Sequence, residues 1–252
     1  MKKNVRLAAA ADLHCDSHNR DFLRELFKAM NDSADVLLFC GDLTDRGLPE
    51  EAKGFRALLE PVTVPAVAVL GNHDFDAGKQ EEIKQILSLG PVSLLDGEEC
   101  REEGVGFAGV KGFAGGFGKY RLQAWGERVL KNFVEEAKEE ALKLESALAR
   151  LEEAPRVALM HYSPVSGIAQ GEPLEIYPFL GSSHLEVPID QFGVTLVLCG
   201  HAHRGCPEGA TAGKVPVYNV SIPMLQKYFP ERPPFRVVEI PLDEKKENPA
   251  HP

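Results

Sequence analysis

The sequence predicts an α/β fold, and three features of its 252 residues lead to that expectation. Short apolar runs alternate with amphipathic stretches over residues 6–89, which is the rhythm of parallel strands joined by helical crossovers. The apolar runs contain hardly any polar residues, as is typical of strands covered on both faces of their sheet. Neither an internal repeat nor a low-complexity linker divides the chain. We therefore expect one domain over residues 1–243 and a polar, flexible tail over residues 244–252.

Six elements are expected in the first third of the chain. Buried strands are expected at residues 6–11, 36–40 and 66–70, where runs such as VLLFC contain only apolar side chains. Helices are expected at residues 22–30, 49–59 and 81–89, because apolar residues recur there at three- and four-residue spacing. Since a helix follows each strand, the three strands should run parallel.

The rest of the chain has a different pattern. Strands are expected at residues 105–110, 156–160, 195–199, 215–220 and 235–240, and one long helix at about 122–153. No helical pattern separates the last two strands, so we expect them to form an antiparallel pair at a sheet edge. Apolar residues in the long helix alternate spacings of four and three from Leu130 to Leu151, which is a heptad seam. We expect this face to pack along the domain, and a homodimer through residues 130–151 is the alternative.

Composition and charge exclude several classes of protein. The formal net charge of −10 argues against a general binder of nucleic-acid polymers, which needs a basic face. No apolar run is long enough to cross a membrane, and the run after Met1 is too short for a signal peptide. The five cysteines include no CxxC pair, which indicates free thiols and a cytoplasmic location.

Polar residues gather just after the ends of five predicted strands. They form the segments Asp12 to His14, Gly41 to Gly47, Gly71 to Asp74, His161 to Tyr162 and Gly200 to His203. The carboxyl edge of an α/β sheet is where ligands bind. Residues two apart in a strand point the same way, so Asp12 and His14 can converge, as can His201 and His203.

The donors in these segments are typical of metal ligands. Seven of them have a nitrogen or oxygen to offer: Asp12, His14, Asp42, Asn72, His161, His201 and His203. Seven ligands are too many for one tetrahedral ion and suit two ions that share a carboxylate, roughly 3.5–4 Å apart. Asp42 follows a central strand and is the natural bridge. Imidazole with carboxylate fits Mn, Fe, Zn, Co or Ni, so two divalent ions of unknown identity are expected.

The ordered motifs DxH, GDxxDxG, GNHD, H and GHxH resemble those of the calcineurin-like metallophosphoesterase superfamily, and they extend from Asp12 to His203. The resemblance implies a four-layer α/β/β/α sandwich of two facing mixed sheets and a two-metal centre for phosphoester hydrolysis. Matched by motif, one ion would be held by Asp12, His14, Asp42 and His203. The other would be held by Asp42, Asn72, His161 and His201.

The same resemblance assigns roles beyond the metal ligands. His73 is implied to lie near the leaving group, Asp45 to orient that histidine, and Arg46 and Asn72 to bind substrate. The expected reaction is attack on a small phosphodiester or phosphomonoester by metal-bound hydroxide, with the diester favoured. His73 would stabilise the charge or protonate the departing alkoxide.

Four alternatives use the same fold. A nuclease is disfavoured by the acidic balance, and a lipid-precursor hydrolase by the lack of a basic amphipathic segment. A protein phosphatase is disfavoured because, apart from residues 41–47, the chain is compact, and a non-catalytic scaffold because the ligands and His73 are intact. The segment 163–188, rich in Gly, Pro and Ser, is expected to select the substrate, and residues 112–118 to form a turn whose amides can face it.

Overall fold

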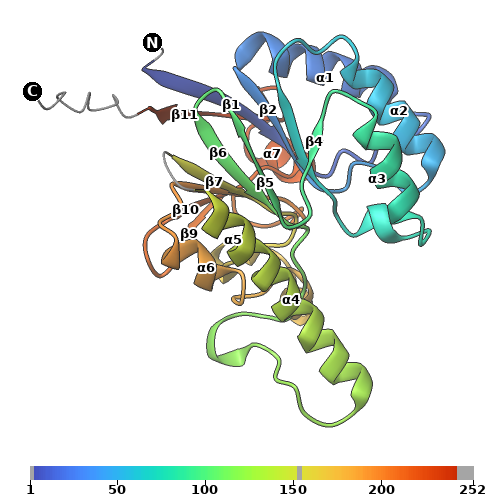
Figure 1. Ribbon diagram of the computed structural model, residues 1–252. Helices are drawn as coiled ribbons and strands as arrows, with labels where there is room; N and C mark the ends of the chain where they lie inside the picture. The colour runs from blue at the N-terminus through green and yellow to red at the C-terminus, as the bar shows by residue number, and fades with distance from the viewer. Residues whose placement is uncertain (1–2, 152–154, 243–252) are drawn as a thin grey trace, which may run out of the picture.

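The computed structural model describes residues 3–151 and 155–242, so the predicted tail at 244–252 lies outside the described residues. Two mixed sheets lie face to face between helices, as the resemblance implies (Figure 1). The first sheet has the strand order β11-β1-β2-β3-β4, and the second has the order β5-β6-β7-β8-β10-β9. The α/β/β/α sandwich is therefore confirmed. Within the described residues, no helix has the length and apolarity needed to span a bilayer.

The first sheet and its helices follow the predicted order closely. They are β1 (Asn4–Ala10), α1 (Arg20–Ser33), β2 (Val36–Cys40), α2 (Pro49–Leu59), β3 (Ala66–Val69), α3 (Gln80–Ser88) and the short β4 (Ser93–Leu94). β1, β2, β3 and β4 are parallel, so the ends of the first three meet at one edge. α2 begins with Pro49, whose missing N–H is not needed in a first turn. Glu51 accepts hydrogen bonds from the main chain of Arg46 and Leu48.

The second sheet contains more strands than the sequence predicts. Its elements are β5 (Glu98–Glu102), β6 (Val105–Gly109), α4 (Arg128–Arg150), β7 (Arg156–Leu159), α5 (Ser166–Ala169), α6 (Glu186–Gln191), β8 (Leu196–Cys199), β9 (Glu208–Ala210) and β10 (Pro216–Asn219). β6, β7, β8 and β10 are parallel, while β5 and β9 add antiparallel edges. The edge strands were not expected because they are half exposed and carry charged residues.

The predicted pairing of the last two strands is wrong. Helix α7 (Ile222–Tyr228) separates β10 from β11 (Arg236–Pro241), and it carries the chain from the second sheet to the first. β11 pairs antiparallel with β1, whereas β10 pairs with β8 and β9. α7 has only seven residues, too few for a helical period to stand out in the sequence.

The long helix is shorter than expected, and its apolar seam packs against the rest of the same chain. α4 begins at Arg128 rather than near residue 122, because the preceding segment turns at Gly126 with a φ of 68°. Leu144 and Leu148 are buried and pack with Ala158 and Met160 of the second sheet. The face that the alternative assigned to a homodimer is thus covered by the same chain.

The core explains how the two sheets are held in register. Side chains alternate along each strand, so Leu37 and Phe39 face the outer helices while Val36 and Leu38 face the second sheet. Phe39 packs with Phe27, at 4.9 Å between ring centres, on the helix side. This layered core brings the carboxyl ends of β1, β2 and β3 opposite those of β7 and β8.

Candidate functional site

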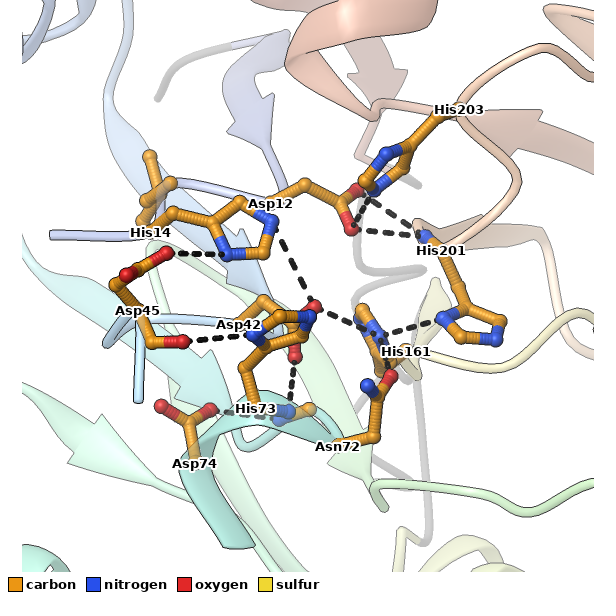
Figure 2. Close-up of polar contacts among 12 residues, drawn as sticks. Asp12, His14, Asp42, Asp45, Asn72, His73, Asp74, His161, His201 and His203 are labelled. Atoms are coloured by element: carbon orange, nitrogen blue, oxygen red, sulfur yellow. Dashed lines mark hydrogen bonds and ion pairs between the residues drawn. The ribbon is translucent and has the colours of Figure 1, made fainter. Parts of the chain in front are cut away.

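The five polar segments do meet at the shared edge of the two sheets. Figure 2 shows the side chains that follow β1, β2, β3, β7 and β8 pointing toward one another. Several of these residues have a left-handed backbone: Asp12 has a φ of 59°, His14 of 44°, Asp42 of 50° and His201 of 68°. Such strain in residues other than glycine is typical of functional sites, where the surrounding fold enforces it.

Motif glycines make room for the ligands. A Cβ atom on Gly71 would collide with the carboxylate of Asp42, and one on Gly41 would collide with the ring of His161. The loops after β2 and β3 therefore approach the ligands as bare backbone. This is why glycine stands directly before Asp42 and Asn72 in the sequence.

In one half of the site, unprotonated nitrogens and side-chain oxygens surround His161. The Nδ1 of His161 donates to the carbonyl of Cys40 at 3.0 Å, so its Nε2 carries the lone pair. That Nε2 lies 2.9 Å from Oδ1 of Asn72, 3.4 Å from Oδ2 of Asp42 and 3.1 Å from Nδ1 of His201. The Nε2 of His201 donates to the carbonyl of Phe179 at 3.1 Å, so its Nδ1 is also unprotonated. The four atoms that meet here are therefore all hydrogen-bond acceptors.

The protonation of the two histidines supports the same conclusion. Burial lowers the pKa of His161 to about 3, and burial also lowers the pKa of His201. Both rings are thus neutral at pH 7 and have no second proton to offer. A cation at this point would satisfy all four donors, and the donor set fits a divalent metal ion.

The other half of the site is built on Asp12. Its Oδ1 lies 2.9 Å from Nε2 of His203, and its Oδ2 accepts the main-chain N–H of His201 at 3.1 Å. The Nε2 of His14 lies 3.8 Å from Oδ2 of Asp42. Three groups have ligand atoms close enough to hold an ion: Asp12, His14 and His203; His14, Asp45 and His73; and Asp12, Asp42 and His161. Oδ2 of Asp42 lies within 4 Å of both His14 and His161, and Asp12 belongs to two of the three groups.

The carboxylates of Asp12 and Asp42 lie close together, and a cation between them would relieve their repulsion. Burial raises the pKa of Asp42 well above its ordinary value, and the neighbouring Asp12 and Asp74 raise it further. For Asp12, burial acts in the same direction, but the hydrogen bond to His203 and the nearby histidine charges leave its pKa below the ordinary value. Positive charge between Asp12 and Asp42 would keep both ionised.

His73 lies beside these ligands. Its main-chain N–H donates to Oδ1 of Asp42 at 2.9 Å, and its Nδ1 donates to the main-chain carbonyl of Asp45 at 2.7 Å. The ring meets that of His14 edge-on, with 4.5 Å between ring centres. The Nε2 of His73 is left as the ring atom available to a substrate.

The expectation for Asp45 needs a correction. Asp45 does orient His73, but through its carbonyl, because the loop 45–47 turns at Gly47 and lies against the main chain of His73. The carboxylate of Asp45 instead lies 3.6 Å from Nδ1 of His14 and 3.4 Å from Nε of Arg46. The carboxylate of Asp76 lies 3.5 Å from Nδ1 of His73, and a carboxylate oxygen of Asp45 lies within 4.8 Å of a ring nitrogen of the same histidine. The three-residue spacing of Asp76 from His73 is a signal that the sequence offered.

Asp74 is a further residue to which the sequence analysis gave no role. It is fully buried and accepts hydrogen bonds from the main chain of Gly71, Leu43 and Thr44 and from the hydroxyl of Thr44. It therefore ties the loop of Asp42 to the loop of Asn72. Its place next to His73 in the GNHD motif could have indicated this role.

The predicted substrate residue Arg46 lies at the border of the site. Its side chain is 78% exposed, and it lines a cavity of about 320 Å³ together with His18, Arg20 and Asp45. Asn72, the other predicted substrate residue, lies at His161 among the ligands. The cavity thus lies next to the candidate ligands, because Asp45 lines it and also lies 3.6 Å from His14.

The two loops expected to contact a substrate lie together. The main chain of Gly115 donates to Pro178 at 2.7 Å, and that of Gly116 donates to Gly181 at 2.8 Å. Phe179, in the same segment, supplies the carbonyl that receives Nε2 of His201. The segments 112–118 and 163–188 therefore lie side by side next to His201.

Comparisons with known proteins show what the chain is similar to. The family of calcineurin-like phosphoesterases matches residues 5–205. A probable cyclic nucleotide phosphodiesterase of Synechococcus sp. is 27% identical over 183 residues, which cover 70% of this chain and 61% of that protein. The match thus spans less than two thirds of the Synechococcus protein.

Solved structures share the fold. The phosphopantetheinyl hydrolase PptH of Mycobacterium tuberculosis has a TM-score of 0.68 at 16% identity, and the similarity covers 94% of this chain and 97% of that one. The protein TT1561 of Thermus thermophilus has a TM-score of 0.57 at 17% identity, over 88% and 91% of the two chains. At these identities the similarity concerns the fold alone.

Proposed function

The chain belongs to the calcineurin-like phosphoesterase family, and on that premise we propose that it is a binuclear metal-dependent hydrolase of small phosphodiesters. The observation that carries the proposal is the meeting of unprotonated nitrogens and a carboxylate oxygen around Asp42. The Synechococcus relative, named a probable cyclic nucleotide phosphodiesterase, supports a diester over a monoester. The five cysteines are unpaired, which supports a reducing, cytoplasmic location.

As the family motifs imply, the donors would divide into two sets that share Asp42. One set would consist of Asp12, His14, Asp42 and His203, and the other of Asp42, Asn72, His161 and His201. Mn, Fe, Zn, Co or Ni suits both sets. When bound, two such ions acidify a water molecule and neutralise charge that develops on the phosphate.

The protein's own groups would hold the substrate and move the proton. Nδ1 of His73 donates to the carbonyl of Asp45, so Nε2 would carry a proton only in the doubly protonated ring, and that form would pass the proton to the departing alkoxide. The main-chain N–H of His73 donates to Asp42, which holds this residue beside the proposed metal ligands. Arg46, exposed beside the cavity, would bind a phosphate oxygen, and Asn72 would orient the phosphate from the opposite side.

A substrate panel on metal-stripped protein tests the proposal. We expect no hydrolysis of bis(p-nitrophenyl) phosphate or p-nitrophenyl phosphate until Mn, Fe, Zn, Co or Ni is restored, and then faster hydrolysis of the diester. The variant Asp42→Asn should stay inactive with every metal. The matched control Asp21→Asn, which changes a 95% exposed carboxylate on α1, should behave like the wild type. Full turnover after stripping would refute metal dependence, and faster monoester hydrolysis would refute the diester.

A further inference from the structure

Aromatic rings form a closed circuit next to the metal ligand His201. The ring of Tyr162 lies 4.5 Å from that of His201, and Phe113 lies 6.0 Å from Tyr162. Phe133 lies 5.0 Å from Phe113, and Phe179 meets Phe133 edge-on at 6.4 Å. The carbonyl of Phe179 then returns to Nε2 of His201. Tyr162, Phe113, Phe133 and Phe179 therefore form a wall of rings whose two ends both contact His201.

The inner side of this wall is filled by a buried lysine. The ammonium of Lys111 lies 4.8 Å from the ring centre of Phe113, 5.6 Å from that of Tyr162 and 5.4 Å from that of Phe75. Lys111 is 8% exposed and donates to the carbonyl of Gly112. Cation–π contacts of this kind fix the rings in place. Lys111 thus packs against Phe113 and Tyr162 in the interior of the protein.

The other side of the wall is open. Phe179 is 55% exposed although its carbonyl contacts His201, which lies beside the buried His161. Residues 118–129 and 174–179 carry six of the twelve large apolar side chains that are exposed in the described part of the chain. The segment before α4, drawn in green, projects beyond the two sheets (Figure 1). The two segments meet at Gly115, which bonds to both Pro178 and Leu122, and exposed apolar side chains gathered in this way are typical of a binding surface.

We propose that Phe113, Phe133 and Phe179 form a subsite for a flat aromatic group of the phosphoester. This inference rests on the proposed function and names the class of substrate: a diester in which one ester group is aromatic. A flat ring can stack on or meet these rings edge-on, whereas a methyl ester reaches none of them. Nδ1 of His201 faces the candidate ligands and its Nε2 faces Phe179, so the organic group of an ester held at the ligands would extend past His201 to meet the wall.

Two diesters with the same leaving group test the subsite. Methyl p-nitrophenyl phosphate and phenyl p-nitrophenyl phosphate both release p-nitrophenolate, so they differ only in the group that stays on phosphorus. For Phe179→Ala we expect kcat/KM to fall roughly tenfold or more on the phenyl ester and less than about twofold on the methyl ester. Phe179→Tyr should keep most of the preference. Phe22→Ala, which removes a 41% exposed ring from α1, is the matched control and should change neither value.

Metal content distinguishes the subsite from support of a ligand. Phe179→Ala keeps the carbonyl that receives His201, so the variant should bind as much metal as the wild type. Equal losses on both esters, or a loss of metal, would overturn the proposal. Unchanged kcat/KM on both esters would overturn it too, and would favour a surface for a macromolecule.

A binding measurement separates this inference from the proposed function. Calorimetry on the metal-loaded protein should give tighter binding of phenylphosphonate than of methylphosphonate, and Phe179→Ala should remove the difference. If the wild type hydrolyses neither diester but shows this difference, the proposed function fails and the subsite stands. If the two phosphonates bind equally, the subsite is refuted whatever the activity.

Discussion

Replacement of His73 by alanine isolates the proton-transfer step from metal binding. The contact of His73 with Asp42 is made by its main-chain N–H, at 2.9 Å, and alanine keeps that group. The ring itself is 36% exposed, so its loss should change the stability of the fold little. We therefore expect His73→Ala to fold normally and to retain its metal.

The expected loss of activity is that of a positioned general acid. Such a group contributes about 10²–10⁴-fold, which corresponds to about 3–5 kcal/mol of transition-state stabilisation. The loss should be large for an alkyl leaving group, because a poorly departing alkoxide needs a proton. It should be much smaller for p-nitrophenolate, which departs without one.

The assay compares mutant and wild-type rates on a good and a poor leaving group at saturating metal. Ethyl p-nitrophenyl phosphate and diethyl phosphate are suitable probes of the two cases. Equal losses on both would refute acid catalysis and leave charge stabilisation as the role of His73. A variant that no longer holds its full complement of metal would make His73 part of the ligand set.

Three further substitutions probe the supports of the site. Asp45→Asn should weaken metal binding more than it lowers the rate of metal-saturated protein, because its carboxylate faces His14 while its carbonyl still holds His73; a metal titration of both proteins checks this, and an unchanged affinity would contradict it. Asp74→Ala should destabilise the fold by about 2–4 kcal/mol, since it leaves buried N–H groups and the Thr44 hydroxyl without an acceptor; urea unfolding measures the loss, and less than about 1 kcal/mol would argue against the tie. Burial alone would raise the pKa of Asp96, but hydrogen bonds and charges from Lys84 and Lys143 leave that pKa below the ordinary 3.8. The ionised carboxylate therefore stabilises the fold at neutral pH, and this contribution is lost as the pH falls below about 4. Asp96→Asn should therefore flatten the acid limb of the stability curve, and an unchanged limb would exclude this contribution.

The ligand set was accessible from the sequence because short motifs encode local geometry. Asp12 and His14 follow one strand at a spacing of two, and the packing of the two sheets brings the five strand ends together. The parallel strands of the first sheet were found for a similar reason, since their apolar runs are uninterrupted. These features depend on neighbours in the chain.

Features that depend on distant contacts were missed. β5 and β9 are edge strands whose pairing partners, not their composition, make them strands. The orientation of Asp45 depends on how the loop 45–47 lies against His73, which no motif states. The circuit of rings joins positions from Phe113 to His201, and only the fold brings them together.

The central claim is that two metal ions share Asp42, and a count of bound metal tests it most directly. Elemental analysis of the purified protein should find two divalent ions per chain, and Asp42→Asn should lose most of both while Asp21→Asn keeps them. Replacing the shared carboxylate by a neutral amide removes a charge that both cations need. Retention of two ions by Asp42→Asn with full turnover, or a fully active wild type that holds a single ion, would contradict the account.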